Sequence, residues 1–171
     1  MNYKSIFWIL TIILCALLPA SAQDQALLDK GDFAPNFTEI DAQGNTISLD
    51  DFKGKVVLLN FTATWCGPCW EAYTPMNELQ EQYKDDLVII SFHMDNMKKK
   101  WKEKAESKGI KFDVISIWES DTKKEIFKSF APELYPSFVI INKEGKIKKK
   151  WSGYLEFTLR RRVHKAMRKH K

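Results

Sequence analysis

The stretch "GKVVLLNFTATWCGPCW", residues 54–70, joins a continuous apolar run to two cysteines that lie two residues apart. The run is rich in β-branched residues, which is typical of a strand covered on both faces of a sheet. Gly67-Pro68 then interrupts the pattern. The apolar residues beyond it recur at three- and four-residue spacing: Met76, Leu79 and Tyr83. A buried strand therefore leads, through the cysteine pair, into a helix that we expect to run to about Lys84.

The rest of the chain alternates between strand and helix patterns. Upstream, "FTEI" and "NTISL" alternate apolar and polar residues around "DAQG", which predicts a hairpin. The predicted order downstream is a strand at 86–94, a polar helix at 95–109, a strand at 112–118, a helix at 121–130, a hairpin at 135–154 that turns at 143–145, and a last helix at 155–171. This order predicts an α/β fold with a mixed sheet.

Two of the predicted helices carry more detailed signals. Asp95 or Asn96 is expected to cap the polar helix, because both side chains accept hydrogen bonds from a first helical turn. The last helix has one apolar stripe at four-residue steps: Leu155, Leu159, Val163 and Met167. The stripe predicts that this helix packs against the body with a wet basic face.

The N-terminal segment has the order of parts found in a secretory signal peptide. Lys4 precedes an apolar run at 6–18, and Ala20-Ser21-Ala22 has the small-x-small form of a cleavage site. The run is shorter than the roughly 20 residues of a membrane-spanning helix. We therefore expect residues 1–22 to be removed and the protein to be exported, to a bacterial periplasm. An uncleaved membrane anchor is the alternative.

The charge of the chain is concentrated in its tail. Removal of 22 residues from 171 leaves 149, enough for one domain, residues 23–171. Of the 27 Lys and Arg, one lies in the leader and seven in the last 13 residues, so residues 23–158 carry 19 against 22 Asp and Glu. The net positive charge of the whole chain therefore does not indicate nucleic-acid binding. The tail is suited to weak contact with anionic lipid or an acidic partner.

The cysteine pair has three possible roles: a metal half-site, a structural staple, or disulfide exchange. Loss of Cys15 with the leader would leave only Cys66 and Cys69, so no second pair completes a zinc site. A bond across so short a loop restricts the unfolded chain little, which disfavours a staple. At a strand–helix junction, the first helical N–H groups favour a thiolate on Cys66. Cys66 would then attack a disulfide and Cys69 would resolve the mixed disulfide.

"NFTATWCGPC", with "LYPSFVIINKEGKI" far downstream, resembles the thioredoxin superfamily. The hairpin leader and the signal segment resemble its exported TlpA/ResA-type branch. The resemblance covers almost all of residues 31–154 and implies a thioredoxin fold, a mixed central sheet flanked by helices, with an N-terminal β-hairpin extension. It implies that Cys66 is the nucleophile, that Cys69 resolves, and that Pro136 is a cis-proline facing the disulfide. Ser137 stands where the family usually has Thr.

Two positions depart from the family pattern. Asn60 stands where thioredoxins carry a buried Asp, and Ala72 stands where the exported branch often carries Glu. Glu71 lies one residue early, and one residue turns a helical side chain by about 100°. We therefore expect Glu71 to point toward solvent and not to act as a proton shuttle.

Other interpretations of neighbouring residues remain open. A copper chaperone would use the ligands His93, Met94 and Met97, although core or rim positions are commoner for such residues. Peroxiredoxins have Thr three residues before the cysteine, where this chain has Ala63. Trp70 either extends the substrate contact or leans on a neighbouring loop. The substrate-binding residues are expected to be Trp65, Gly67, Pro68, Trp70, Tyr135 and Pro136.

The resemblance favours a reductase of protein disulfides, because Gly-Pro between the cysteines is the dipeptide of reducing thioredoxins. It implies no cofactor and no metal, and suggests a membrane thiol donor and a role in cytochrome c maturation or extracytoplasmic repair. A disulfide-forming or isomerising protein and a non-enzymatic binding module are the alternatives.

Overall fold

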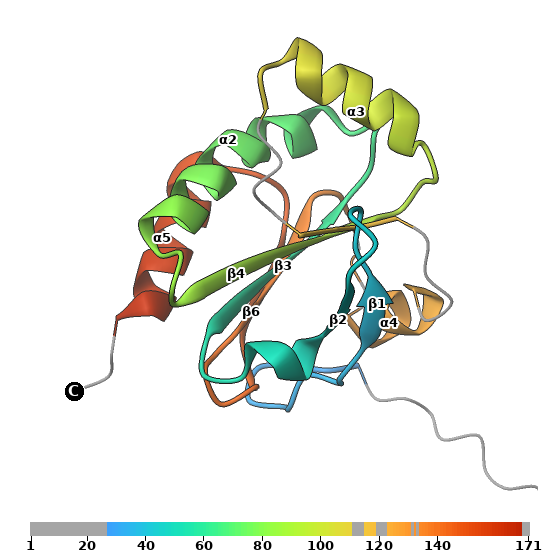
Figure 1. The fold of residues 1–171 in the computed structure, drawn as a ribbon. Coiled ribbons are helices and arrows are strands. Elements are labelled where there is room, and N and C mark those ends of the chain that lie inside the picture. Colours follow the sequence, from blue (N-terminus) through green and yellow to red (C-terminus); the bar gives the residue numbers. More distant parts are fainter. Residues whose placement is uncertain (1–26, 111–114, 119–122, 131, 133, 169–171) are drawn as a thin grey trace, which may run out of the picture.

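The computed structural model describes residues 27–110, 115–118, 123–130, 132 and 134–168 (Figure 1). The predicted leader, residues 1–22, lies outside the described residues, as do positions 112–114 and 121–122 of two predicted elements. No helix among the described residues is long and apolar enough to cross a membrane.

A five-stranded mixed sheet forms the centre, in the order β5-β4-β3-β6-β7. Its strands are β3 (Val56–Thr62), β4 (Leu87–His93), β5 (Ile115–Ile117), β6 (Ser137–Ile141) and β7 (Ile147–Ser152). The first three run parallel, β6 is antiparallel to β3, and β7 is antiparallel to β6. Every residue of β3 and β4 is buried, as their unbroken apolar runs predict. The predicted mixed sheet is confirmed.

Helices cover both faces of this sheet (Figure 1). They are α2 (Gly67–Gln82), α3 (Lys98–Ser107), α4 (Lys123–Phe130) and α5 (Glu156–Met167). Helices α2, α3 and α5 pack on the face that carries Val56 and Leu58, and α4 packs on the opposite face with Val57 and Leu59. The alternation along β3 follows from the two-residue period of a strand.

The predicted N-terminal hairpin is present as a separate two-stranded sheet. Its strands are β1 (Thr38–Ile40) and β2 (Thr46–Ser48), followed by a short 3-10 helix, η1 (Leu49–Phe52). Phe37, Ile47 and Leu49 bury their side chains in the same core as α4. The hairpin thus completes the second face of the sheet.

The β6–β7 turn is also where the sequence predicts it. Gly145 donates its N–H to the carbonyl oxygen of Asn142 at 2.9 Å and has a φ of 79°, a conformation that glycine adopts without strain. The Gly31 N–H donates to the carbonyl oxygen of Ile147 at 2.8 Å, so the first described segment lies along the edge of β7.

Two predictions of helix ends are wrong. The N-cap of α3 is Met97, with no side-chain cap, and neither Asp95 nor Asn96 occupies that position. The N-cap of α5 is Leu155, which has an extended backbone and is 71% exposed, so it is not part of the buried stripe. Leu159 and Val163 are fully buried, as predicted, and Met167 is partly buried.

Candidate active site around the Cys66–Cys69 disulfide

The chain turns from β3 into α2 immediately before the cysteine pair. The N–H of Cys66 donates to the carbonyl oxygen of Ala63 at 3.1 Å, which closes the turn. Cys66 is the N-cap of α2, and its Sγ accepts a hydrogen bond from the Cys69 N–H at 3.2 Å. Pro68 lies in the first turn, where a missing N–H leaves no helical bond unmade.

The two cysteines are joined in a disulfide, with their Cα atoms 5.3 Å apart. Cys66 is 5% exposed and Cys69 only 1%, so Cys66 is the more exposed of the two cysteines. The first turn of α2 carries no acidic residue. The partial positive charge of the helix N-terminus is therefore not offset by a carboxylate in that turn, which favours a thiolate on reduced Cys66.

An exposed apolar rim surrounds the buried disulfide. The Trp65 ring is 67% exposed and meets the edge of the Tyr135 ring at 5.9 Å between centroids. Tyr135 also packs against the cluster of Ala63, Cys66 and Cys69, and partial burial raises the pKa of its hydroxyl. Leu134, which the sequence did not single out, is 65% exposed. Gly67-Pro68 is exposed as well.

The Tyr135–Pro136 peptide bond is cis, as the resemblance implied. The carbonyl oxygen of Pro136, in the next peptide bond, accepts a hydrogen bond from the Gly153 N–H at 2.8 Å. The Ser137 hydroxyl donates to the carbonyl oxygen of Leu134 and lies 2.7 Å from the Ser152 hydroxyl. The loop before β6 is thus fixed to the end of β7. The substrate contacts of these residues remain predictions.

Asp95 holds the loop in front of the disulfide. One carboxylate oxygen accepts from the Thr64 N–H at 2.6 Å, and the other accepts from the Thr64 hydroxyl at 2.8 Å and from the Met97 N–H at 3.1 Å. The sequence indicated Asp95 only as a helix cap. Its bonds to Thr64 join residues 31 positions apart, which local spacing cannot predict.

Trp70 belongs to the core and not to the rim. It is 4% exposed, its ring stacks on Trp101 at 5.8 Å, and its Nε1–H donates to the carbonyl oxygen of Thr64 at 3.0 Å. The Lys104 ammonium lies 5.0 Å above the ring. We therefore withdraw Trp70 from the residues expected to contact substrate, because its surface is covered by the chain itself.

At both departures from the family pattern, the buried position carries no carboxylate. Asn60 is fully buried, and its Nδ2 donates to the Ser91 hydroxyl at 3.0 Å. Ala72 is fully buried too, while Glu71 is exposed, as expected. The nearby Tyr73 hydroxyl is not a base, because burial raises its pKa to about 12.

The candidate copper ligands differ in their surroundings. His93 is fully buried and stacks on Trp118 with ring centroids 3.5 Å apart. Met94 and Met97 are 37% and 43% exposed. Within the described part of the chain, no group of three His, Cys, Asp or Glu side chains is arranged to hold a metal ion.

Comparison with known proteins gives consistent matches. The model of the AhpC/TSA family matches residues 30–150. The thiol-disulfide oxidoreductase ResA of Bacillus thuringiensis subsp. konkukian is 38% identical over 121 residues, 70% of this chain and 68% of that protein. ResA of Bacillus subtilis is 31% identical over 150 residues, 85% of this chain and 82% of that protein. The crystal structure of a putative thiol:disulfide interchange protein DsbE from Chlorobium tepidum superposes with a TM-score of 0.71 at 26% identity and covers 81% of this chain and 98% of that one.

Proposed function

Because the chain belongs to the AhpC/TSA family and is a thiol–disulfide oxidoreductase of the thioredoxin fold, we propose that it reduces disulfides of exported proteins through the Cys66–Cys69 dithiol. The observation that carries the proposal is the difference in exposure between the two cysteines. Cys66, at the helix N-terminus, is the more exposed, and Cys69, one turn inside, is almost fully buried.

The reaction has two exchanges. The Cys66 thiolate attacks one sulfur of the substrate disulfide, and the other substrate sulfur leaves as a thiolate. The Cys69 thiolate then attacks the Cys66 sulfur and releases the second substrate thiolate. Two electrons pass to the substrate, and the protein is left with the Cys66–Cys69 disulfide. A thiol donor, which we propose to be membrane-bound, must reduce this bond before the next cycle.

The apolar rim favours an extended or unfolded substrate segment. Trp65 and Leu134 expose about two thirds of their surface beside a disulfide that is itself buried. A substrate must therefore lay its chain against the rim to bring a disulfide to Cys66. Immature cytochrome c and misoxidised exported proteins offer such segments, so both maturation and extracytoplasmic repair suit this site. The leader at residues 1–22 supports a periplasmic location.

The direction of exchange follows from the reduction potential, and its measurement is the decisive test. We expect a value more negative than about −200 mV, on the scale where strong periplasmic oxidants lie near −120 mV. Equilibration with glutathione or thioredoxin buffers gives the potential. A value on the oxidising side would instead assign the protein to disulfide formation or isomerisation.

The order of attack is tested by trapping. A Cys69→Ser variant should accumulate mixed disulfides with substrates through Cys66, because the resolving thiol is missing. The Cys66→Ser variant is the matched control and should trap few partners. The reverse result would exchange the roles of the two cysteines. Full biological function with both cysteines replaced by serine would identify a binding module.

A further inference from the structure

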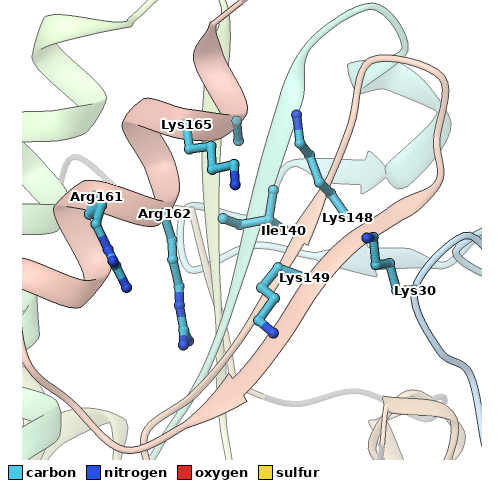
Figure 2. Close-up of a pocket in the computed structure, with 8 residues that line it drawn as sticks. Lys30, Ile140, Lys148, Lys149, Arg161, Arg162 and Lys165 are labelled. Carbon is cyan, nitrogen blue, oxygen red and sulfur yellow. The ribbon is translucent and has the colours of Figure 1, made fainter.

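A basic groove lies between α5 and the strands β6 and β7, away from the disulfide. It has a volume of about 600 Å³. The residues that line it are Lys30, Ile140, Lys148, Lys149, Arg161, Arg162, Lys165 and Ala166. Figure 2 shows Arg162 and Lys165 extending from α5 toward β7, where Lys149 lies. Six of the eight lining residues are cationic and none is acidic, so the groove is a concentrated positive surface.

Five of the six groove cations have no acidic partner among the residues that the structure describes. Among the residues that the structure describes, Lys30, Lys149, Arg161, Arg162 and Lys165 form no ion pair. Four carboxylates of neighbouring segments already accept hydrogen bonds from other groups. Glu78 and Glu156 both pair with Arg160, and Asp29 and Asp32 accept from the backbone N–H groups of Lys30 and Asp29.

Arg162 supplies a second observation that favours an anion in the groove. Its guanidinium lies 4.5 Å above the Trp151 ring. In the described part of the chain, its Nη1 is buried and has no hydrogen-bond partner. Burial and the neighbouring Arg161 lower the pKa of Arg162. A bound oxyanion would give the buried N–H groups an acceptor and stabilise the charge.

Two exposed phenylalanines lie on the elements that flank the groove, each beside a cation. Phe33, in the segment along the edge of β7, is 66% exposed, and the Lys146 ammonium lies 4.9 Å from its ring centroid. Phe157, on α5, is 74% exposed, with the Arg161 guanidinium at 5.6 Å. Exposed aromatic rings next to Lys and Arg are characteristic of surfaces that lie in a membrane interface.

We propose that this groove and its two phenylalanines dock the protein on anionic phospholipids. Head-group phosphates enter the groove, where Lys and Arg donate hydrogen bonds to their oxygens, and the Phe33 and Phe157 rings enter the interface. A membrane suits the surface better than a soluble phosphate does, because a soluble phosphate would leave both rings in water.

The groove itself is set back from the disulfide along the sheet. Lys149 pairs with Ile140, which pairs with Leu58. Leu58 lies four residues before Thr62, the end of β3 that leads to the disulfide. At about 3.3 Å per residue, Lys149 lies roughly 13 Å along the sheet from that end.

Vesicle binding tests the proposal. The exported protein, purified as a secreting host processes it, is sedimented with vesicles of phosphatidylcholine alone or with about 30 mol% phosphatidylglycerol. The groove variant Lys149→Glu/Lys165→Glu is compared with Lys99→Glu/Lys102→Glu on α3, which changes the net charge equally. All four lysines are exposed. Unchanged disulfide-reductase activity shows that each variant is folded.

We expect the wild type to prefer the anionic vesicles and to lose that preference at high salt. The groove variant should bind at least tenfold more weakly and the α3 variant within threefold of the wild type. Equal loss in both variants, or no preference of the wild type for anionic vesicles, would overturn the proposal. Binding of inorganic phosphate at Arg162, seen by NMR without vesicle binding, would identify a soluble-anion site and would also overturn it.

Discussion

Replacement of Asp95 tests whether the loop before the disulfide is held from a distance. In Asp95→Ala, the Thr64 N–H and hydroxyl and the Met97 N–H all lose their acceptor. Thr64 is 7% exposed, so water replaces the carboxylate poorly at its two groups. At about 1 kcal/mol for each Thr64 donor and a few tenths for Met97, the free energy of unfolding should fall by about 2 to 3 kcal/mol.

The loss is measured by urea unfolding and by the melting temperature, which should fall by about 4 to 12 °C in a domain of this size. Well below that temperature, kcat/KM for a protein disulfide should fall about tenfold, because the freed loop carries Cys66 and misplaces the attacking sulfur. Asp95→Asn keeps one acceptor oxygen and should lose about half as much stability. Asn96→Ala, at the exposed neighbouring position, is the control. A stability change in Asp95→Ala below about 0.5 kcal/mol would refute the reasoning.

Three further substitutions address α2 and the strand beneath it. Trp70→Ala should lower the free energy of unfolding by about 3 to 5 kcal/mol, because the ring is buried in the core, and should leave KM for a protein disulfide unchanged. A raised KM at normal stability would show instead that Trp70 contacts the substrate. Glu71→Gln should change the reductase rate less than threefold, because its side chain is exposed, and a tenfold loss of turnover would contradict this. Asn60→Asp places a carboxyl group in the core. Desolvation there raises its pKa above the ordinary value of about 3.9. The folded state then binds the proton more tightly than the unfolded state, so the stability of the variant relative to the wild type should fall as pH rises above about 3.9. Urea unfolding at pH 4 and pH 8 measures this difference. A difference that does not change with pH would indicate a hydrated site.

The sequence predicts well the features that depend on local pattern. The apolar runs of β3 and β4 and the turn at Gly145 follow from periodicity and from glycine, and they are where expected. The cis bond at Pro136 came from family resemblance alone. Leu155 shows the limit of a stripe argument. Its spacing fits the helix, but the chain enters α5 one residue later, so the side chain lies outside the buried face.

Tertiary partners account for the features that the sequence did not predict. Asp95 has the composition of a helix cap, and only the fold brings Thr64 within reach of its carboxylate. Trp70 follows a cysteine near the surface, yet Trp101 from α3 and the Thr64 carbonyl oxygen draw its ring inward. The basic tail is visible in the sequence, but its combination with Lys149 of β7 into one groove is not. In each case the deciding contact joins segments far apart in the chain.

The buried face of α2 also restricts how Cys69 can lose its proton. Cys69 is 1% exposed among apolar neighbours, so burial opposes formation of its thiolate in the mixed disulfide. Asn60 carries no charge, Glu71 points away, and the Tyr73 hydroxyl, with a pKa of about 12, stays protonated at neutral pH. Since none of these three side chains supplies a base, we expect the proton of Cys69 to pass to water or to the leaving substrate thiolate. Release of the reduced substrate should therefore depend on how well the substrate segment seals the rim at Trp65, because a loosely bound segment admits the water that resolution needs.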